Sequence, residues 1–181
     1  MNALIRTVGV TVVLMVGLPA GSVLAASAVE IDARAAEALD QLRTRSAAAA
    51  LLDKAAGVLV FPRVLKAGFG LGGHYGEGTL QVGGKSVGYY NVAAASFGFQ
   101  LGGQVRKQAI LFMTDEALES FQHSRNWRIG VDGSVAVATA GVGEEIDNST
   151  AQAPVIGFVF GNKGLMYNLT LDGSKISPIQ R

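Results

Sequence analysis

The sequence predicts an α+β protein in which an amino-terminal helix and one short inserted helix accompany a mostly antiparallel curved sheet or partly closed β-barrel. Two observations carry this prediction. Apolar residues recur at helical spacing from Ile31 to Leu52, and the pattern stops at Gly57. Beyond Gly57 the chain changes to short β-like runs separated by glycine. A helix followed by many strands, without regular alternation of the two, favours α+β.

Capping residues place the two helices. Ser27 and Glu30 form a capping-box pair, so the first helix is expected to begin there, with a break near residues 44–46. Its apolar stripe is mostly alanine, which favours packing on a sheet over insertion into a bilayer. The second helix is expected to begin after Thr114 and to end around Ser124.

The β-like runs give the expected strands and turns. Strands are predicted at residues 58–61, 68–73, 79–82, 87–90, 93–101, 108–113, 133–139, 155–160 and 165–171. Hairpin turns are predicted at Gly83-Gly84 and at residues 161–164.

One predicted strand has an unusual glycine row. Gly68, Gly70 and Gly72 alternate with Phe69 and Leu71, so one face of an extended strand would be bare backbone. Glycine in a strand costs roughly 0.5 to 1 kcal/mol relative to alanine. The row therefore predicts close packing, a sharp barrel bend or a ligand.

Residues 1–25 resemble a secretory signal. Arg6 precedes an apolar run, Pro19 and Gly21 interrupt it, and a small-x-small cleavage pattern ends at Ala25. We expect export, with residues 26–181 as a single domain that is periplasmic or peripherally associated with the cell envelope. The chain contains no cysteine, which excludes disulfide-linked partners and Cys-ligated metals.

The charge balance argues against a nucleic-acid binder. Arg6 is the only charged side chain of residues 1–25, so the rest of the chain holds 14 basic and 14 acidic side chains. Basic residues nevertheless predominate in residues 61–112, where Glu77 is the only acid. This asymmetry predicts either a basic face for an anionic partner or two solvated faces of opposite charge.

The sequence offers no recognisable catalytic or metal-binding set. The two histidines, His74 and His123, are 49 positions apart, and no Gly-x-Ser-x-Gly elbow surrounds a serine. His74 with Glu77 as its orienting acid is the best candidate base, but a surface turn histidine is the simpler interpretation. We therefore expect no enzyme activity, no metal and no cofactor.

Arg63 and Lys66 are the first candidate binding residues. Pro62 is expected to end a buried strand, so residues 63–66 are predicted to form a turn that presents both cations beside Val64, Leu65 and Phe69. Cations next to exposed apolar groups suit an anionic lipid, although an ordinary solvated turn explains the pattern equally well.

The sequence also resembles the SYLF domain family of lipid-binding modules. Five segments carry the resemblance in order: AGVLVFPRVLKAGFG (56–70), GGHYGEG (72–78), ASFGFQLG (95–102), GVDGSVAV (130–137) and GLMYNLTLDGSKI (164–176). The resemblance implies lipid binding without catalysis, since eukaryotic relatives bind phosphoinositides and some associate with actin. An exported protein would normally meet neither, and the alanine-rich first helix is less apolar than the membrane-inserting segment of those relatives.

Together these observations predict a non-enzymatic protein that binds anionic phospholipid at a membrane surface. The candidate lipid contacts are Arg63, Lys66, Phe69, Lys107 and Lys163. The main alternative is a structural or protein-interaction module that associates with itself or with a protein partner. A third hypothesis is hydrolysis with His74 as the base.

Overall fold

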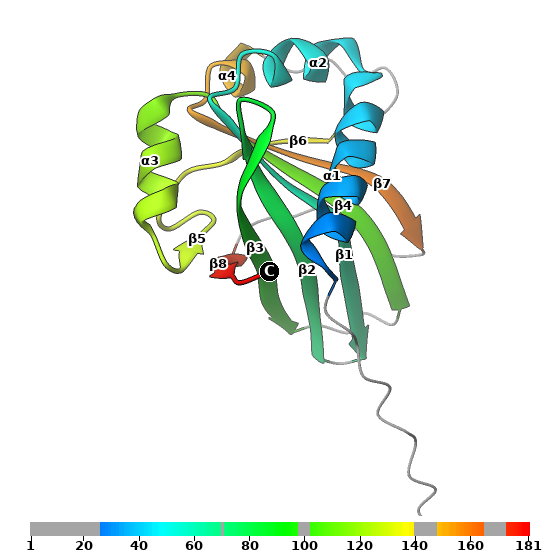
Figure 1. The fold of residues 1–181 in the computed structure, drawn as a ribbon. Coiled ribbons are helices and arrows are strands. Elements are labelled where there is room, and N and C mark those ends of the chain that lie inside the picture. Colours follow the sequence, from blue (N-terminus) through cyan, green and yellow to red (C-terminus); the bar gives the residue numbers. More distant parts are fainter. Residues whose placement is uncertain (1–25, 70, 98–101, 140–147, 165–172) are drawn as a thin grey trace, which may run out of the picture.

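The fold is an eight-stranded, curled half-barrel sheet with helices packed against it (Figure 1). The computed structural model describes residues 26–69, 71–97, 102–139, 148–164 and 173–181. The elements are α1 (Ala28–Arg43), α2 (Ser46–Leu52), β1 (Gly57–Phe69), β2 (Leu71–Val82), β3 (Lys85–Phe97), β4 (Gly102–Phe112), α3 (Asp115–His123), β5 (Trp127–Arg128), β6 (Ala136–Thr139), α4 (Asn148–Ala151), β7 (Val155–Gly164) and β8 (Lys175–Ile179).

The strand order is β5-β8-β3-β2-β1-β4-β7-β6, and every pairing is antiparallel except β6 with β7. This arrangement confirms the predicted α+β class with a mostly antiparallel curved sheet. Strands β1 to β4 pair with their neighbours over long stretches, so they form the centre of the sheet. The predicted strand at residues 165–171 lies outside the described residues.

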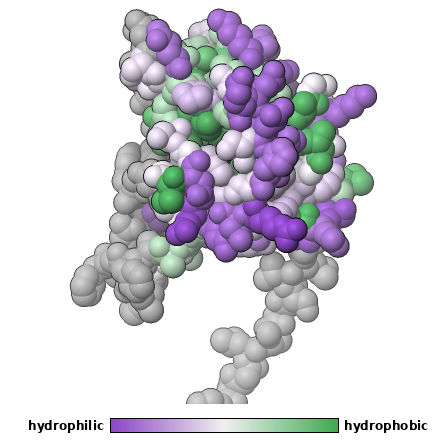
Figure 2. All heavy atoms as spheres, turned by 90° about the vertical axis from the view of Figure 1, so that its left-hand side faces the viewer, coloured by the Kyte–Doolittle hydropathy of each residue, from purple (hydrophilic) through white to green (hydrophobic). Residues whose placement is uncertain are grey.

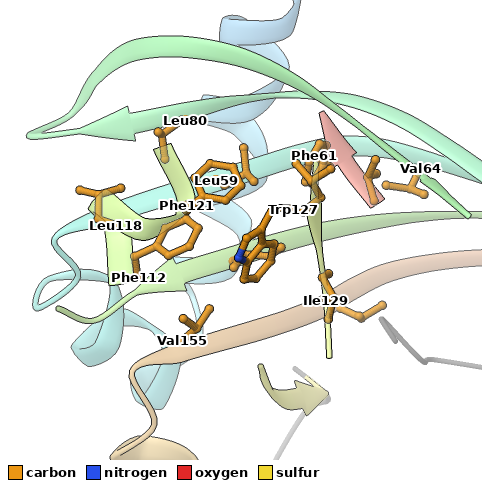
Figure 3. Packing of buried hydrophobic residues seen from close by; sticks show 14 residues of the cluster. Leu59, Phe61, Val64, Leu80, Phe112, Leu118, Phe121, Trp127, Ile129 and Val155 are labelled. Atoms are coloured by element: carbon orange, nitrogen blue, oxygen red, sulfur yellow. The ribbon is translucent and has the colours of Figure 1, made fainter. Parts of the chain in front are cut away.

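The sheet has two differently packed faces. We call the face that α1 covers the outer face and the opposite face, which α3 covers, the inner face. The inner-face core contains a group of aromatic rings, in which the Phe121 ring lies tilted 4.8 Å from Phe112 and edge-to-face 5.5 Å from Trp127, centroid to centroid (Figure 3). Such ring pairs add about 0.5–1.5 kcal/mol beyond the area they bury.

Helix α1 packs on the outer face, as its alanine-rich stripe predicts. The predicted cap is present, because Ser27 Oγ accepts a hydrogen bond from the Glu30 amide at 3.2 Å. Asp32 accepts hydrogen bonds from Ser86 and Tyr89 of β3, both at 2.8 Å. These contacts and the buried alanine and leucine stripe hold the helix against the sheet. The predicted break is also confirmed, since α1 ends at Arg43 and α2 begins at Ser46.

Strand β1 contains a bulge at Pro62. Its pairing with β2 advances from Val60 to Arg63 while β2 moves only from Thr79 to Glu77, so β1 carries one extra residue. Proline has no N–H to donate, and in a central strand it is tolerated at a bulge. The prediction that Pro62 ends the strand is therefore wrong, and residues 63–66 continue β1 and form no turn.

Two further turn predictions have different outcomes. Gly83 and Gly84 form the predicted two-residue hairpin turn, with φ values of +57° and +77°. Gly161 also has a positive φ of +64°, but it lies inside β7, where the register with β4 shifts. The predicted turn at residues 161–164 is therefore wrong. Gly161 instead accommodates an irregularity within strand β7.

The glycine row does not form one strand. Gly68 is the second-to-last residue of β1 and Gly72 the second residue of β2, and the two residues pair with each other across the hairpin. Gly70 lies outside the described residues. The tightest backbone approach occurs at Gly78, opposite the bulge, where an added Cβ would lie 2.0 Å from the Val60 carbonyl oxygen. Among the described glycines, Gly78 is therefore the one packed most tightly against backbone.

We expect Gly78→Ala to lower the thermal unfolding midpoint. The added methyl meets backbone that cannot rotate away, and such overpacking costs typically ~1–3 kcal/mol, or about 2–12 °C for a domain of this size. Gly103→Ala is the matched control, because its Cβ would lie 4.0 Å from the nearest atom, the Lys66 carbonyl oxygen. Scanning calorimetry on both variants tests the assignment, and equal midpoints would contradict it.

Candidate functional site

Part of the outer face is left uncovered by α1. Figure 1 shows β1, β2 and β3 continuing past the amino-terminal end of this helix. Four aligned residues cross this surface, because Val105 pairs with Leu65, Leu65 with Tyr75 and Tyr75 with Ala93. We call these four residues the outer row. Leu65 and Tyr75 are each 48% exposed, so the row presents two large apolar side chains to solvent.

Lysines flank the outer row at the level of the backbone. Ala93 pairs with Lys175 of β8, whose side chain is exposed. At the other end Val105 pairs with Lys163 of β7, although the Lys163 side chain lies outside the described residues. An apolar stripe with cations at its ends is typical of surfaces that meet anionic membranes.

Arg63 lies on the same face, two residues before Leu65, and is exposed. It pairs across the strands with Glu77. Glu77 already accepts hydrogen bonds from the Tyr75 hydroxyl at 2.9 Å and from Arg181 Nη2 at 2.5 Å. Burial, followed by the hydrogen bond from Tyr75 to Glu77, raises the Tyr75 pKa. Within the described residues no ion pair joins Arg63 to an acid, so its charge is available to a partner.

A strip of small residues lies beside the outer row, on the side toward the β1–β2 hairpin. Ala67 pairs with Gly103 and with Gly73, and Gly73 pairs with Ala95. Without large side chains in this strip, Leu65 and Tyr75 stand above their surroundings. Among the described residues, no large side chain of this strip stands between Leu65 or Tyr75 and a flat partner.

The inner face carries a contrasting group of basic side chains. Lys66 of β1 pairs directly with His74 of β2, and Arg106 of β4 pairs with Val64, two residues before Lys66. We call Lys66, His74 and Arg106 the basic cluster. Lys66 is 7% exposed and Arg106 is 1% exposed. Three basic groups thus share a largely dehydrated site.

The basic cluster perturbs its own ionisation. Burial, followed by the charges of Arg106 and Lys66, lowers the His74 pKa to about 4. Burial and the charge of Arg106 lower the Lys66 pKa, and burial lowers the Arg106 pKa. Burial and nearby positive charge lower these pKa values in the same direction, because each disfavours the protonated, charged form of a basic group.

Polar side chains complete the inner site. Ser174 Oγ lies 3.1 Å from His74 Nε2, and Ser174 is fully buried. With its amide oxygen turned toward Arg106, Gln108 accepts hydrogen bonds from Nη2 at 2.7 Å and from Nε at 2.9 Å. Gln104, which pairs with Lys66, has a buried Oε1 with no hydrogen-bond partner among the described residues.

The hypothesis that His74 and Glu77 form a base and its orienting acid is wrong. The two residues are three apart in one strand, so their side chains lie on opposite faces, and Glu77 is engaged by Tyr75 and Arg181. Ser174 takes the place next to His74, but no hydrogen bond of His74 reaches a carboxylate in the described part of the chain. Nor do the described residues contain a cluster of metal-binding side chains.

The candidate lipid contacts separate in space. Arg63 lies on the outer face, whereas Lys66 lies in the basic cluster. Lys107 contacts α1 through Gln41 at 2.9 Å and Glu37 at 3.3 Å, so its ammonium group holds the helix on the sheet. The Phe69 and Lys163 side chains lie outside the described residues.

Tyr75, Arg106 and Lys175 were not singled out by sequence reasoning. The available signal is the alternation of strand residues, which places every second side chain on one face. The alternation assigns these side chains to the correct face only if residues 57–69 form one strand with a bulge.

Other surfaces fit a membrane less well. Figure 2 shows the side with α3 and β5, where hydrophilic residues predominate and hydrophobic ones form separate patches. Within the described residues no helix combines the length and the apolar character needed to cross a membrane.

Comparison with known proteins supports the family resemblance. Residues 93–181 match the model of the Ysc84 family, described as Las17-binding protein actin regulator. Over these residues the chain matches the SYLF domain family, as its sequence predicts. No curated protein matches the chain. The description of this family concerns protein binding, and the match covers the carboxyl-terminal part of the chain.

The lowered His74 pKa predicts a loss of stability in mild acid. The unfolded chain binds a proton near pH 6.5, whereas the folded chain does so only near pH 4. The proton uptake by the unfolded state makes the free energy of unfolding fall as the pH drops from 7 toward 4.5. Among the described residues, the groups next to His74 are its cross-strand partner Lys66, the charged Arg106, and Ser174, whose Oγ lies 3.1 Å from His74 Nε2.

Urea titrations at pH 7.0, 6.0, 5.0 and 4.5 measure this effect. His74→Asn removes the titrating ring, so the variant should have a shallower pH profile than the wild type. Parallel profiles of the two proteins would contradict the assignment, because other groups contribute equally to both.

Proposed function

We propose that this protein is a non-enzymatic module that binds anionic phospholipid at a membrane surface of the cell envelope. The observation that carries the proposal is the outer row, where exposed Leu65 and Tyr75 stand beside Arg63, an exposed cation with no ion pair among the described residues. In this arrangement the apolar side chains enter the region between headgroups and acyl chains. The cations beside them contact the phosphate groups of the lipid headgroups.

The residue types fit the two layers of a membrane surface. Tyrosine favours the interface because its ring is apolar and its hydroxyl is polar. Each basic side chain near an anionic surface contributes about 1 kcal/mol. Two half-exposed apolar residues and two or three cations give weak, reversible binding, which suits a peripheral module.

Arg63 and Lys175 are the headgroup contacts in this arrangement. Lys163 is a further candidate, because its backbone pairs with Val105 at the end of the outer row. Export and residence in the envelope follow from the signal-like character of residues 1–25. The family match supports a binding module in general, and the choice of anionic lipid comes from the charges of the outer face.

We expect Leu65→Ser and Arg63→Gln each to weaken binding to vesicles of phosphatidylglycerol by about fivefold, the equivalent of ~1 kcal/mol. Co-sedimentation measures the effect. Val87→Ser and Lys85→Gln are the matched controls. Val87 is 53% exposed, compared with 48% for Leu65, and Lys85 is an exposed cation at the β2–β3 turn. Thermal midpoints verify that all four variants are folded.

Salt and lipid composition provide the second measurement. Binding should fall as sodium chloride increases, since charge attraction is screened over ~10 Å at 0.1 M. Equal binding to phosphatidylcholine and phosphatidylglycerol would contradict the proposed role of Arg63. Absence of vesicle binding, together with an oligomer in light scattering that Leu65→Ser dissociates, would favour the self-association alternative.

A further inference from the structure

The basic cluster is made of residues that take no part in the proposed membrane surface. Lys66 and Leu65 are adjacent in β1, so their side chains lie on opposite faces of the sheet. The cluster lies on the inner face beyond the apolar core, where the inward-facing residues of β1 and β4 change from hydrophobic to polar. In β4 this polar series is Gln108, Arg106 and Gln104, all of which are buried.

Two groups at the cluster, Lys66 and the neighbouring Gln104, lack partners within the described residues. Moving a charged group out of water is costly unless an opposite charge and hydrogen bonds compensate. Within the described residues Lys66 Nζ has no hydrogen bond or ion pair, although Lys66 is only 7% exposed. The buried Gln104 Oε1 beside it also has no hydrogen-bond partner there.

We propose that the basic cluster binds one oxyanion of the phosphate class, with Lys66 as its main charged contact. The Lys66 ammonium group donates hydrogen bonds to the anion, and Arg106, one residue pair away, adds positive charge. A hydrogen phosphate also carries an O–H that donates to Gln104 Oε1, so a single ligand satisfies both unpartnered groups.

Ser174 and His74 form the wall beside this anion. The neutral His74 ring adds no like charge, because its pKa of about 4 keeps it deprotonated at neutral pH. Its contact with Ser174 fixes the ring against β8, 100 positions away in the sequence.

Two sources can supply a phosphate oxyanion to Lys66: free inorganic phosphate, or the phosphodiester of a lipid headgroup, which has no P–O–H to donate to Gln104 Oε1. The first experiment uses inorganic phosphate alone. Phosphate at ten times its dissociation constant should raise the thermal midpoint by about 3 to 6 °C over sodium chloride of equal ionic strength.

Lys66→Met tests the contact directly. Methionine keeps much of the length and apolar stem of lysine without its charge. The variant should be at least as stable as the wild type in chloride, because a buried charge is gone, and it should lose the increment due to phosphate. Lys85→Met is the matched control, since Lys85 is exposed at the opposite end of the sheet, and it should keep the increment. Equal phosphate increments in wild type and Lys66→Met would overturn the proposal.

An NMR titration of the wild type does not depend on any variant folding. Phosphate should move the ring resonances of His74 along a saturable curve, while those of His123, on the exposed side of α3, serve as the internal reference. Equal, non-saturating shifts of both rings would overturn the proposal.

Vesicles then identify the source. If the ligand is a lipid headgroup, Lys66→Met weakens binding to phosphatidylglycerol vesicles and inorganic phosphate competes with them. If the ligand is free phosphate, Lys66→Met leaves vesicle binding unchanged and removes only the phosphate increment. Either result is independent of Leu65 and Arg63, so the outer-face proposal and this one can fail separately.

Discussion

The bulge at Pro62 is the constraint on which the rest of the structure depends. Before it, the odd-numbered residues Leu59 and Phe61 face the inner core. After it, the even-numbered residues Val64 and Lys66 do so, because one extra residue shifts the alternation. In a regular strand Leu65 would point into the core and Lys66 into solvent. The bulge therefore creates both the outer row and the basic cluster.

The partner strand is built around this irregularity. Opposite the bulge, β2 has Gly76 and Gly78, where an added Cβ would lie 2.7 Å from the Arg63 carbonyl oxygen and 2.0 Å from the Val60 carbonyl oxygen. Any side chain there would displace the β1 backbone. Proline in one strand and glycine in its neighbour thus act together, since the first requires extra room and the second supplies it.

The two faces use positive charge in physically different ways. On the outer face Arg63 remains hydrated, so its charge has little desolvation cost. Salt screens that charge, so its attraction to a partner is weak. On the inner face Lys66 and Arg106 are dehydrated, so their charge is costly alone and strong toward a bound anion. Basic residues three positions apart, Arg63 and Lys66, therefore have separate roles, and their sequence proximity does not make them one site.

The sequence by itself determined the features that depend on neighbouring residues. These include the Ser27 cap, the break before Ser46, the Thr114 cap, the Gly83-Gly84 turn and the α+β class. Each results from local hydrogen bonding or backbone preference, which a short window of sequence contains. The family resemblance was also readable, because it rests on ordered motifs.

Only the tertiary structure decided which side chains share a site. The contact between His74 and Ser174, the alignment of Val105 with Leu65 and Tyr75, and the attachment of Lys107 to α1 all depend on strand register and helix docking. A bulge of one residue moves every later side chain of the strand to the opposite face. The energy that holds the bulge in place comes from packing across several strands. That energy is not local to any segment. The cations can therefore be recognised in the sequence, whereas what each of them faces depends on the folded sheet.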